Sequence, residues 1–535
     1  MDDSIGVALS IALAYKENGG QYLIVASNLY KAQRIFNYLS SFLNKDDVLL
    51  FPSDELIRAE TLAQSKEMVA HRLYVMNEIL KGNGRVIVAN IAAVCRYLPD
   101  PIVFSNKTLD FKIGGHYEIS ELKRRLIKNG YSLVSKIDQS LQFAVRGDIL
   151  DIFSVNNDHP IRIEFFDNEI ESIRFFDIAT QQSIEKIDKV TVLPASDILL
   201  NDEDLSKAAD KIFDVLEKDK THMSLGDFEL LRDNVEIDIT NIIAGLFDER
   251  VYKYYSLITN KHFSLFDYCP TFTRVFVDDM AIEQANKLLQ EDSFNYLEEL
   301  HSNYKITSHL EMYQDIHRIA SINPRQAIVT SQLITSSDDT NFSVKNVPFQ
   351  ASKEKDAFNI IQNYLNENYE IVICLNNSQH INVLEEGLSE LGIKYEPVHD
   401  FGLPKASHIG ISALNFSGGF VLPEQKIVYL TGSELFNEKV RVARFDNRFK
   451  EGTILKSYED LEPGDYVVHE YQGIGQFLEL QTLEVDGVHK DYLKIAYNGG
   501  ELLYVPLAQF QLVRKYLGKE GATPRLSRLH TKDWE

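Results

Sequence analysis

The sequence has few of the residues that mark a metal site, a redox centre or a disulfide-stapled secreted domain. Its 535 residues include only three cysteines, Cys95, Cys269 and Cys374, which lie far apart in apolar surroundings. An odd and sparse cysteine count is typical of a chain that stays in a reducing compartment. We therefore expect a cytoplasmic protein with buried, unreactive thiols and no bound metal.

Long hydrophobic runs are also absent. The longest candidate, residues 5–15, is well short of the roughly 20 apolar residues that a membrane-spanning helix needs. It also lacks the basic flank of a signal peptide. The run is therefore predicted to be a helix of a buried core, and no membrane partner is expected.

Basic charge is in short supply, with 55 lysine and arginine residues against 79 acidic ones and a net charge of -24. Because non-specific DNA binding depends on neutralising phosphates, an acidic chain is a poor DNA binder by default. Residues 514–532 are a local exception in which basic side chains dominate. Two interpretations of this stretch are open, a solvated tail or a patch that faces DNA.

The sequence has no phosphate cradle of the P-loop type, which needs a glycine-rich turn and a lysine. Residues 3–8 offer one glycine and no lysine. Residues 275–279 (VFVDD) look like a Walker B strand, but acids between a strand and a helix are commonly helix caps. We favour the capping role, and we predict no catalytic residues, no cofactor and no ATP hydrolysis for this chain.

The chain alternates between strand-like and helix-like runs, and its length suits three to five domains. In residues 1–105 the alternation predicts an α/β layer with a parallel sheet. Residues 106–194 read as an α+β insert with mostly antiparallel strands. Residues 195–315 are largely helical, and residues 316–450 restart an α/β pattern. The predicted fold class is thus multidomain, with α/β and α+β parts.

Short strand-like runs follow one another near the C-terminus, from GDYVVHEYQGIGQF (464–477) through TLEVDG and DYLKIAY to LLYVPL. DYLKIAY alternates apolar and other residues with the period of a half-buried strand. Regular short strands predict a small, closed or nearly closed β-barrel of the SH3/Tudor type, with a closing helix at 507–516. The barrel has no catalytic motif, so we expect it to bind rather than to react, with His469 in a structural role.

Five stretches of the chain stand in the order found in bacterial transcription-repair coupling factors, the Mfd family. They are FPSDE (51–55), RGDILDIF (146–153), RIEFFDNEIESIRFFD (162–177), GGFVLPEQKIVYLTGSELF (418–436) and the C-terminal barrel. The first three resemble the module that this family shares with the excision-repair protein UvrB. The barrel resembles the family's CarD-like, RNA-polymerase-interacting domain, although Gln472 replaces the family's usual histidine in HGIG.

The resemblance implies the N-terminal half of such a factor. It divides the chain into a UvrB-like domain in two parts (1–105 and 195–315), a UvrA-binding insert (106–194), a linking domain (316–450), a polymerase-binding barrel (455–526) and the start of a linker (527–535). In the family an ATP- and magnesium-dependent translocase motor follows and makes most of the DNA contact. The chain is therefore expected to be a monomeric scaffold for the β subunit of stalled RNA polymerase and for UvrA, in nucleotide excision repair.

Residues of the insert are candidates for the UvrA contact. The period of 2 in IRIEFF (161–166) places three apolar residues on one face and Arg162, Glu164 and Phe166 on the other. An exposed arginine beside a phenylalanine is typical of a binding hot spot. The alternative is a solvated Arg–Glu face with Phe166 tucked under a neighbour. The resemblance implies that Arg146, Arg162 and Phe166 contact UvrA, with Arg174 as a weaker candidate.

The long hydrophobic run GIGQFLELQTLEV (473–485) is the candidate for the polymerase contact. An unpaired strand edge can accept a strand from another protein through main-chain hydrogen bonds. The alternative is an internal hairpin strand. The resemblance implies that this run faces the polymerase β subunit, with Leu483 as the apolar anchor and Thr482, Glu484 and Val485 beside it.

Two functions of other classes are alternatives. The first is a UvrB-like excision helicase, against which the missing P-loop lysine and the appended barrel both argue. The second is a stand-alone CarD-like transcription regulator, which would not need a UvrB-like front end of about 450 residues.

Overall fold

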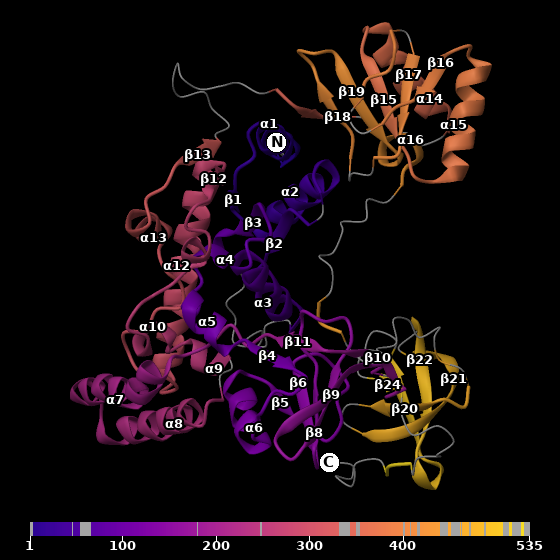
Figure 1. Ribbon diagram of the computed structural model, residues 1–535. Helices are drawn as coiled ribbons and strands as arrows, with labels where there is room; N and C mark the ends of the chain where they lie inside the picture. Colours follow the sequence, from indigo (N-terminus) through magenta and orange to yellow (C-terminus); the bar gives the residue numbers. More distant parts are fainter. Residues whose placement is uncertain are drawn as a thin grey trace. The chain divides into compact units, whose positions relative to one another are not determined.

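The structure of the chain is a computed structural model (Figure 1). It describes residues 4–44, 46–53, 66–178, 180–246, 249–330, 343–348, 354–399, 402–406, 408–414, 418–438, 448–450, 461, 463–469, 472–485, 488–506, 513–515 and 526–528. The chain divides into two compact units. The first contains residues 1–109, 125–131 and 193–448, and the second contains residues 110–124, 132–192 and 449–535.

The first unit begins with a five-stranded parallel sheet in the order β13-β12-β1-β3-β2. Its strands are β1 (Tyr22–Ala26), β2 (Val48–Phe51), β3 (Val86–Asn90), β12 (Thr273–Val277) and β13 (Ala327–Thr330). All five residues of both β1 and β3 are buried, as expected for central strands covered on both faces. The predicted parallel α/β layer is confirmed.

Strand β13 departs from the predicted organisation. The sequence grouped this run with the domain at 316–450, but the strand pairs with β12 in the first sheet. A short apolar strand carries no local signal of its pairing partner, so the alternation pattern alone could not assign it to this sheet.

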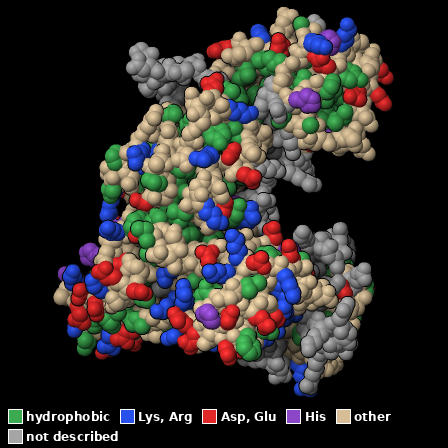
Figure 2. All heavy atoms as spheres, in the orientation of Figure 1, with side chains coloured by type: hydrophobic (Ala, Val, Ile, Leu, Met, Phe, Trp, Pro, Cys, Tyr) green, Lys and Arg blue, Asp and Glu red, His purple; other side chains and the backbone are tan. Residues whose placement is uncertain are grey.

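Helices cover this sheet and extend from it. Those before the insert are α1 (Ser4–Asn18), α2 (Leu29–Phe42), α3 (Lys66–Leu80), α4 (Ile91–Cys95) and α5 (Pro101–Lys107). Those after it are α7 (Asp202–Asp219), α8 (Leu225–Ile243), α9 (Glu249–Tyr252), α10 (Tyr255–Ile258), α11 (Leu265–Tyr268), α12 (Asp279–Ser302) and α13 (Ile316–Ile322), with the 3-10 turn η1 (Lys220–His222). The side chains of Asn28, Asn201 and Ser224 cap α2, α7 and α8. Acidic side chains gather over α7 and α8 (Figure 2).

A second sheet in the first unit has the order β14-β18-β19-β15-β17-β16 and is drawn in orange in Figure 1. Its strands are β14 (Lys345–Asn346), β15 (Glu370–Cys374), β16 (Lys394–Pro397), β17 (His408–Ser412), β18 (Phe420–Leu422) and β19 (Ile427–Thr431), with helices α14 (Glu354–Asn366), α15 (Ser378–Glu390) and α16 (Gly432–Phe436). One face of this sheet packs in a core with residues of these helices.

The other face of the second sheet shares a hydrophobic core with α1 and α2. This core joins both helices and strands of the first sheet to Val372, Cys374, Phe420 and Tyr429. The rings of Phe42 and Phe420 lie 6.4 Å apart, and those of Phe420 and Tyr429 stack at 4.7 Å. Helix α1 is apolar around most of its circumference because the shared core surrounds it.

The second unit contains the insert, whose main sheet has the order β10-β9-β8-β7-β6-β5. Its strands are β5 (Ser132–Leu133), β6 (Gln142–Arg146), β7 (Ile149–Ile152), β8 (Ile161–Phe166), β9 (Glu169–Phe176) and β10 (Ser183–Ile187). A two-stranded sheet joins β4 (Leu109–Lys112) to β11 (Lys189–Val192), and α6 spans Ile119–Lys128. Every pair in the main sheet is antiparallel except β5–β6, which confirms the α+β character.

The C-terminal part forms a five-stranded antiparallel sheet in the order β23-β22-β21-β20-β24. Its elements are β20 (Tyr466–His469), β21 (Gly473–Val485), β22 (Val488–Ala496), the 3-10 turn η3 (Asn498–Gly500), β23 (Leu502–Pro506) and β24 (Val513–Lys515). A core of its own includes Val467, Phe477, Leu493 and Ile495.

Two predictions for this sheet need correction. In the described residues no strand pairing joins β23 to β24, so the predicted closed SH3/Tudor-like barrel is not confirmed. The predicted helix at 507–516 is wrong at Val513–Lys515, which pair with β20, and its other residues lie outside the described part of the chain. Pairing with a sheet edge overrides a weak helical preference in so short a run.

The three cysteines are buried, as predicted. Burial raises the pKa of all three thiols, that of Cys374 to about 12, so they stay protonated and unreactive near neutral pH. His469 is buried as well. Among the described helices none is long and apolar enough to cross a membrane.

Candidate protein-binding surfaces

One face of the insert sheet carries the residues predicted to contact UvrA. Strand pairing sets Ala144, Asp151, Arg162 and Arg174 side by side across β6, β7, β8 and β9. The opposite face of β8 is buried, because Ile161, Ile163 and Phe165 point into the core as the alternation predicted.

The carboxylate of Asp151 holds two of the predicted arginines. Its Oδ1 accepts a hydrogen bond from Arg162 Nε at 2.7 Å, and its Oδ2 accepts one from Arg162 Nη2 at 2.8 Å. The same Oδ2 accepts a third bond from Arg146 Nη2 at 2.9 Å. The Asp151 side chain is only 1% exposed, so three charge-assisted bonds compensate for its burial.

Arg162 is more enclosed than the sequence predicted. Its side chain is 15% exposed, and its guanidinium lies over the ring of Phe176 at 4.5 Å. The hydrogen bonds to Asp151 raise the pKa of Arg162, against the opposing effect of desolvation. Truncation of Arg162 is therefore expected to destabilise the insert, because it would remove the bidentate partner of a buried carboxylate.

Arg174 belongs to a second ion pair on the same face. It donates two hydrogen bonds to Glu164, one of them at 2.9 Å, and Ser172 donates a third at 2.7 Å. The bond from Arg174, followed by that from Ser172, lowers the pKa of Glu164. Both terminal nitrogens of the Arg174 guanidinium are thus bonded to Glu164 within the sheet, which leaves Arg174 less available to a partner.

Phe166 is the most exposed member of the group, at 72%. It ends β8, and the next residue, Asp167, takes a positive φ of 53° in the turn to β9. The alternative in which Phe166 is tucked under a neighbour is therefore wrong. A large exposed aromatic ring on the same side of β8 as Arg162 has the composition of a binding hot spot.

Arg146 ends β6 immediately before Gly147, whose φ of 59° allows the tight turn into β7. Its side chain is 50% exposed, in contrast to Arg162. Asp151 was not among the predicted contact residues, although it lies within the RGDILDIF motif. Hairpin pairing of this motif with IRIEFF places Asp151 directly opposite Arg162.

The candidate polymerase-binding strand, β21, has different neighbours at its two ends. Gly473–Gln476 pair with β20, and Gln476–Val485 pair with β22. In the described residues no strand pairs with the β20 side of β21 beyond Phe477. The N-terminal end of β21 thus lies between two strands. Its C-terminal end pairs only with β22 and has an open edge on the other side. Thr482, Leu483, Glu484 and Val485 lie in this open part of the backbone.

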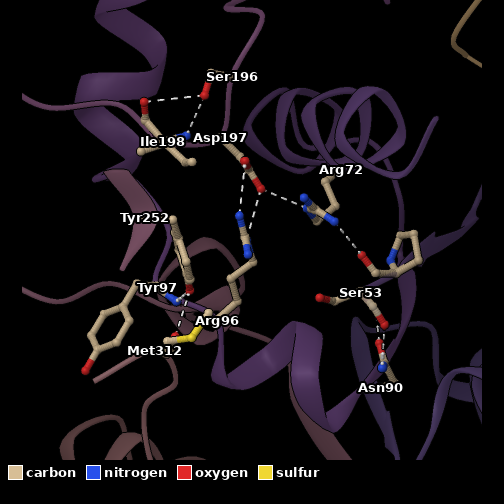
Figure 3. Close-up of polar contacts among 11 residues, drawn as sticks. Ser53, Arg72, Asn90, Arg96, Tyr97, Ser196, Asp197, Ile198, Tyr252 and Met312 are labelled. Carbon is tan, nitrogen blue, oxygen red and sulfur yellow. Dashed lines mark hydrogen bonds and ion pairs between the residues drawn. The ribbon is translucent and has the colours of Figure 1, made fainter. Parts of the chain in front are cut away.

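A buried ion cluster lies in the first unit, around Asp197 in the segment that follows β11. Arg72 Nε donates to Asp197 Oδ2 at 2.8 Å, and Arg96 Nε donates to the same oxygen at 3.2 Å. Figure 3 shows the carboxylate between the two guanidinium groups. Arg72 also donates to the carbonyl of Pro52, which follows β2.

Tyr252 extends this cluster. Its ring lies 4.0 Å from the guanidinium carbon of Arg96, and its hydroxyl accepts from the Tyr97 N–H and donates to the Met312 carbonyl (Figure 3). Burial opposes ionisation of Asp197, but the two arginines outweigh it and lower the pKa of Asp197 to about 2. The carboxylate therefore stays charged in the core.

The strand that resembles Walker B ends at a helix cap. The Asp278 carboxylate accepts the backbone N–H of Ala281 at 3.2 Å at the start of α12, which supports the capping role. The Lys31 ammonium lies 3.9 Å from Asp278. Among the described residues no group of histidine, cysteine, aspartate and glutamate side chains is arranged to hold a metal ion.

Two family models match parts of the chain. The UvrB interaction domain matches residues 109–197, and the CarD-like/TRCF RID domain matches residues 461–517. The two candidate binding surfaces each lie within one of these matches. Fold and matches together define the class of the chain, a multidomain protein that carries a UvrB-type interaction domain and a CarD-like domain.

The chain is also similar to curated proteins over nearly its whole length. It is 30% identical over 534 residues to the transcription-repair-coupling factor of Bacillus subtilis (strain 168), and 26% identical over 533 residues to that of Staphylococcus aureus (strain MRSA252). Each alignment covers 98% of this chain and 45% of the relative. The predicted resemblance is confirmed: the chain is a relative of the transcription-repair-coupling factors, and it spans less than half of their length.

Proposed function

We propose that this chain corresponds to the N-terminal half of a transcription-repair coupling factor and acts as a scaffold with two protein-binding surfaces. The insert binds UvrA, and the C-terminal sheet binds the β subunit of RNA polymerase. Together they bring excision repair to a polymerase stalled at a DNA lesion. The whole protein is a cytoplasmic, ATP-dependent DNA translocase whose motor uses magnesium and makes most of the DNA contact.

The observation that carries this proposal is the face of the insert on which the exposed Phe166 shares one side of β8 with Arg162, which is bonded through Asp151 to Arg146. It lies within the match to the UvrB interaction domain and has the exposed aromatic and cationic groups of a protein-binding hot spot. A UvrB-like helicase is disfavoured, since the acid that would serve a Walker B strand caps a helix. A stand-alone CarD-like regulator would leave the insert surface without a role.

The test is to measure the binding of the purified chain to UvrA and, separately, to RNA polymerase core enzyme by isothermal titration calorimetry. We expect saturable binding to both proteins. Binding to polymerase alone would favour the CarD-like regulator, and binding to neither would refute the proposal.

Replacing Phe166 with alanine is expected to weaken UvrA binding by about 1–4 kcal/mol, because an exposed aromatic anchor contributes mainly to the interface. The melting temperature should stay near that of the unmodified chain, since the ring is 72% exposed. Phe294→Ala, at a ring 63% exposed on α12, is the matched control and should leave UvrA binding unchanged. Equal affinity of Phe166→Ala and the unmodified chain would remove Phe166 from the interface.

The purified chain is expected not to hydrolyse ATP, with or without DNA. A nucleotide site needs a lysine and a glycine-rich turn to hold the phosphates, and residues 3–8 offer one glycine and no lysine. Release of inorganic phosphate is the measurement. Phosphate release above a protein-free control, with or without DNA, would contradict the prediction.

A further inference from the structure

We infer that Asp151 is a positioning residue for the UvrA contact, one that fixes Arg146 and Arg162 in their binding orientation before the partner arrives. The inference rests on the proposed function of the insert. Its basis is that the Asp151 carboxylate on β7 accepts hydrogen bonds from two arginines, one on each of the flanking strands β6 and β8. The three hydrogen bonds are 2.7–2.9 Å long.

The three side chains differ in their access to solvent. Asp151 is 1% exposed, Arg162 15% and Arg146 50%. Asp151 can therefore contribute little contact area of its own to a partner. Arg162 donates hydrogen bonds from both Nε and Nη2 to the carboxylate, and its guanidinium lies over the ring of Phe176. Arg162 is therefore the most constrained of the three side chains. Arg146 donates to Asp151 through Nη2, and its side chain remains 50% exposed and accessible to a partner.

The shared carboxylate favours UvrA binding for two reasons. An arginine side chain loses much rotamer freedom when a partner immobilises it, and an existing ion pair removes part of that loss. One carboxylate between two guanidinium groups also leaves the cluster with a net positive charge. The chemistry that fits it is a carboxylate on the UvrA surface beside an apolar pocket for Phe166.

A purely structural role for Asp151 predicts something different. In that case the carboxylate would only compensate the charge of Arg162, and its loss would destabilise the insert regardless of Arg146. A double-mutant cycle separates the two roles, because residues that act through one another have non-additive effects on affinity.

The experiment is a cycle of Asp151→Asn and Arg146→Ala in the full chain, with UvrA affinity measured by calorimetry well below the melting temperature. Each single variant is expected to bind about 10-fold more weakly, and the double variant about 10- to 20-fold more weakly rather than about 100-fold. The matched control is Glu164→Gln with Arg146→Ala. Glu164 is hydrogen-bonded to Ser172 and Arg174 and not to Arg146, so the effects of these two substitutions should multiply.

A second variant, Asp151→Glu, covers the case in which Asp151→Asn does not fold. It keeps the charge but moves the carboxylate by one methylene, so positioning predicts about 10-fold weaker binding, whereas charge compensation alone predicts none. Multiplicative effects in the Asp151–Arg146 cycle, or unchanged affinity of Asp151→Glu, would overturn the inference while UvrA binding by the unmodified chain stands. Failure of the unmodified chain to bind UvrA would instead refute the proposed function.

Discussion

Replacing Asp197 with alanine is expected to lower the free energy of unfolding of the first unit by about 3–5 kcal/mol, because it leaves two buried guanidinium groups without their carboxylate. The side chains of Arg72 and Arg96 are 0% exposed, and that of Asp197 is 2% exposed. Water therefore cannot replace the lost partner. Urea denaturation followed by circular dichroism measures the change.

The matched control is Glu203→Ala, which removes a carboxylate from an exposed ion pair with Lys207. An exposed pair of this kind contributes little, so this variant should unfold near the urea concentration of the unmodified chain. If Asp197→Ala behaved like the control, the buried cluster would not stabilise the unit.

The contribution of Asp197 should also depend on pH. Its folded pKa of about 2 lies below its ordinary value of 3.8, so its ionised form stabilises the folded state. This contribution, about 2 kcal/mol from the pKa difference, is fully present above pH 4 and is lost as the pH falls toward 2. The stability difference between the unmodified chain and Asp197→Asn should shrink over that interval, and a constant difference would contradict the pKa shift.

The second large effect is expected in the C-terminal sheet. Replacing Leu483 with arginine should weaken binding to the RNA polymerase β subunit about 100-fold, roughly 3 kcal/mol, if a strand of the partner pairs with the open edge of β21. Main-chain pairing gives affinity with little sequence dependence, so specificity must come from side chains beside the edge. Pull-down and calorimetry with the full chain provide the measurement.

The control for Leu483→Arg adds the same charge elsewhere in that sheet. Leu502 on β23 is 42% exposed, so Leu502→Arg should fold and should bind polymerase as the unmodified chain does. Equal binding by the two variants would remove Leu483 from the interface. Absence of binding by the unmodified chain would refute the polymerase contact itself.

Elements with a strong local pattern were predictable from the sequence. The apolar runs of β1 and β3 predicted central parallel strands, and the alternation in IRIEFF assigned the faces of β8 correctly. The same reasoning failed for β24, where three residues pair with β20 inside a run that was read as a helix. So short a run carries too little periodicity to outweigh the sheet edge beside it.

Contacts between distant segments could not be predicted in this way. Arg72 and Asp197 are 125 residues apart in the sequence, and no local pattern pairs them. The assignment of β13 to the first sheet has the same origin, because its partner β12 lies before α12 and α13. The position of Asp151 opposite Arg162 could have been predicted, because the two residues lie on consecutive paired strands. The sequence pattern did not indicate that the Asp151 carboxylate would be buried.

The core that α1 and α2 share with the second sheet affects how the chain folds during synthesis. At about 5–20 residues per second, a ribosome needs about 20–75 s for the roughly 380 residues between Phe42 and Phe420. Throughout that time the nascent α1–α2 surface lacks the aromatic partners that later cover it. This surface is therefore available to chaperones that bind exposed apolar segments until β18 and β19 have been translated.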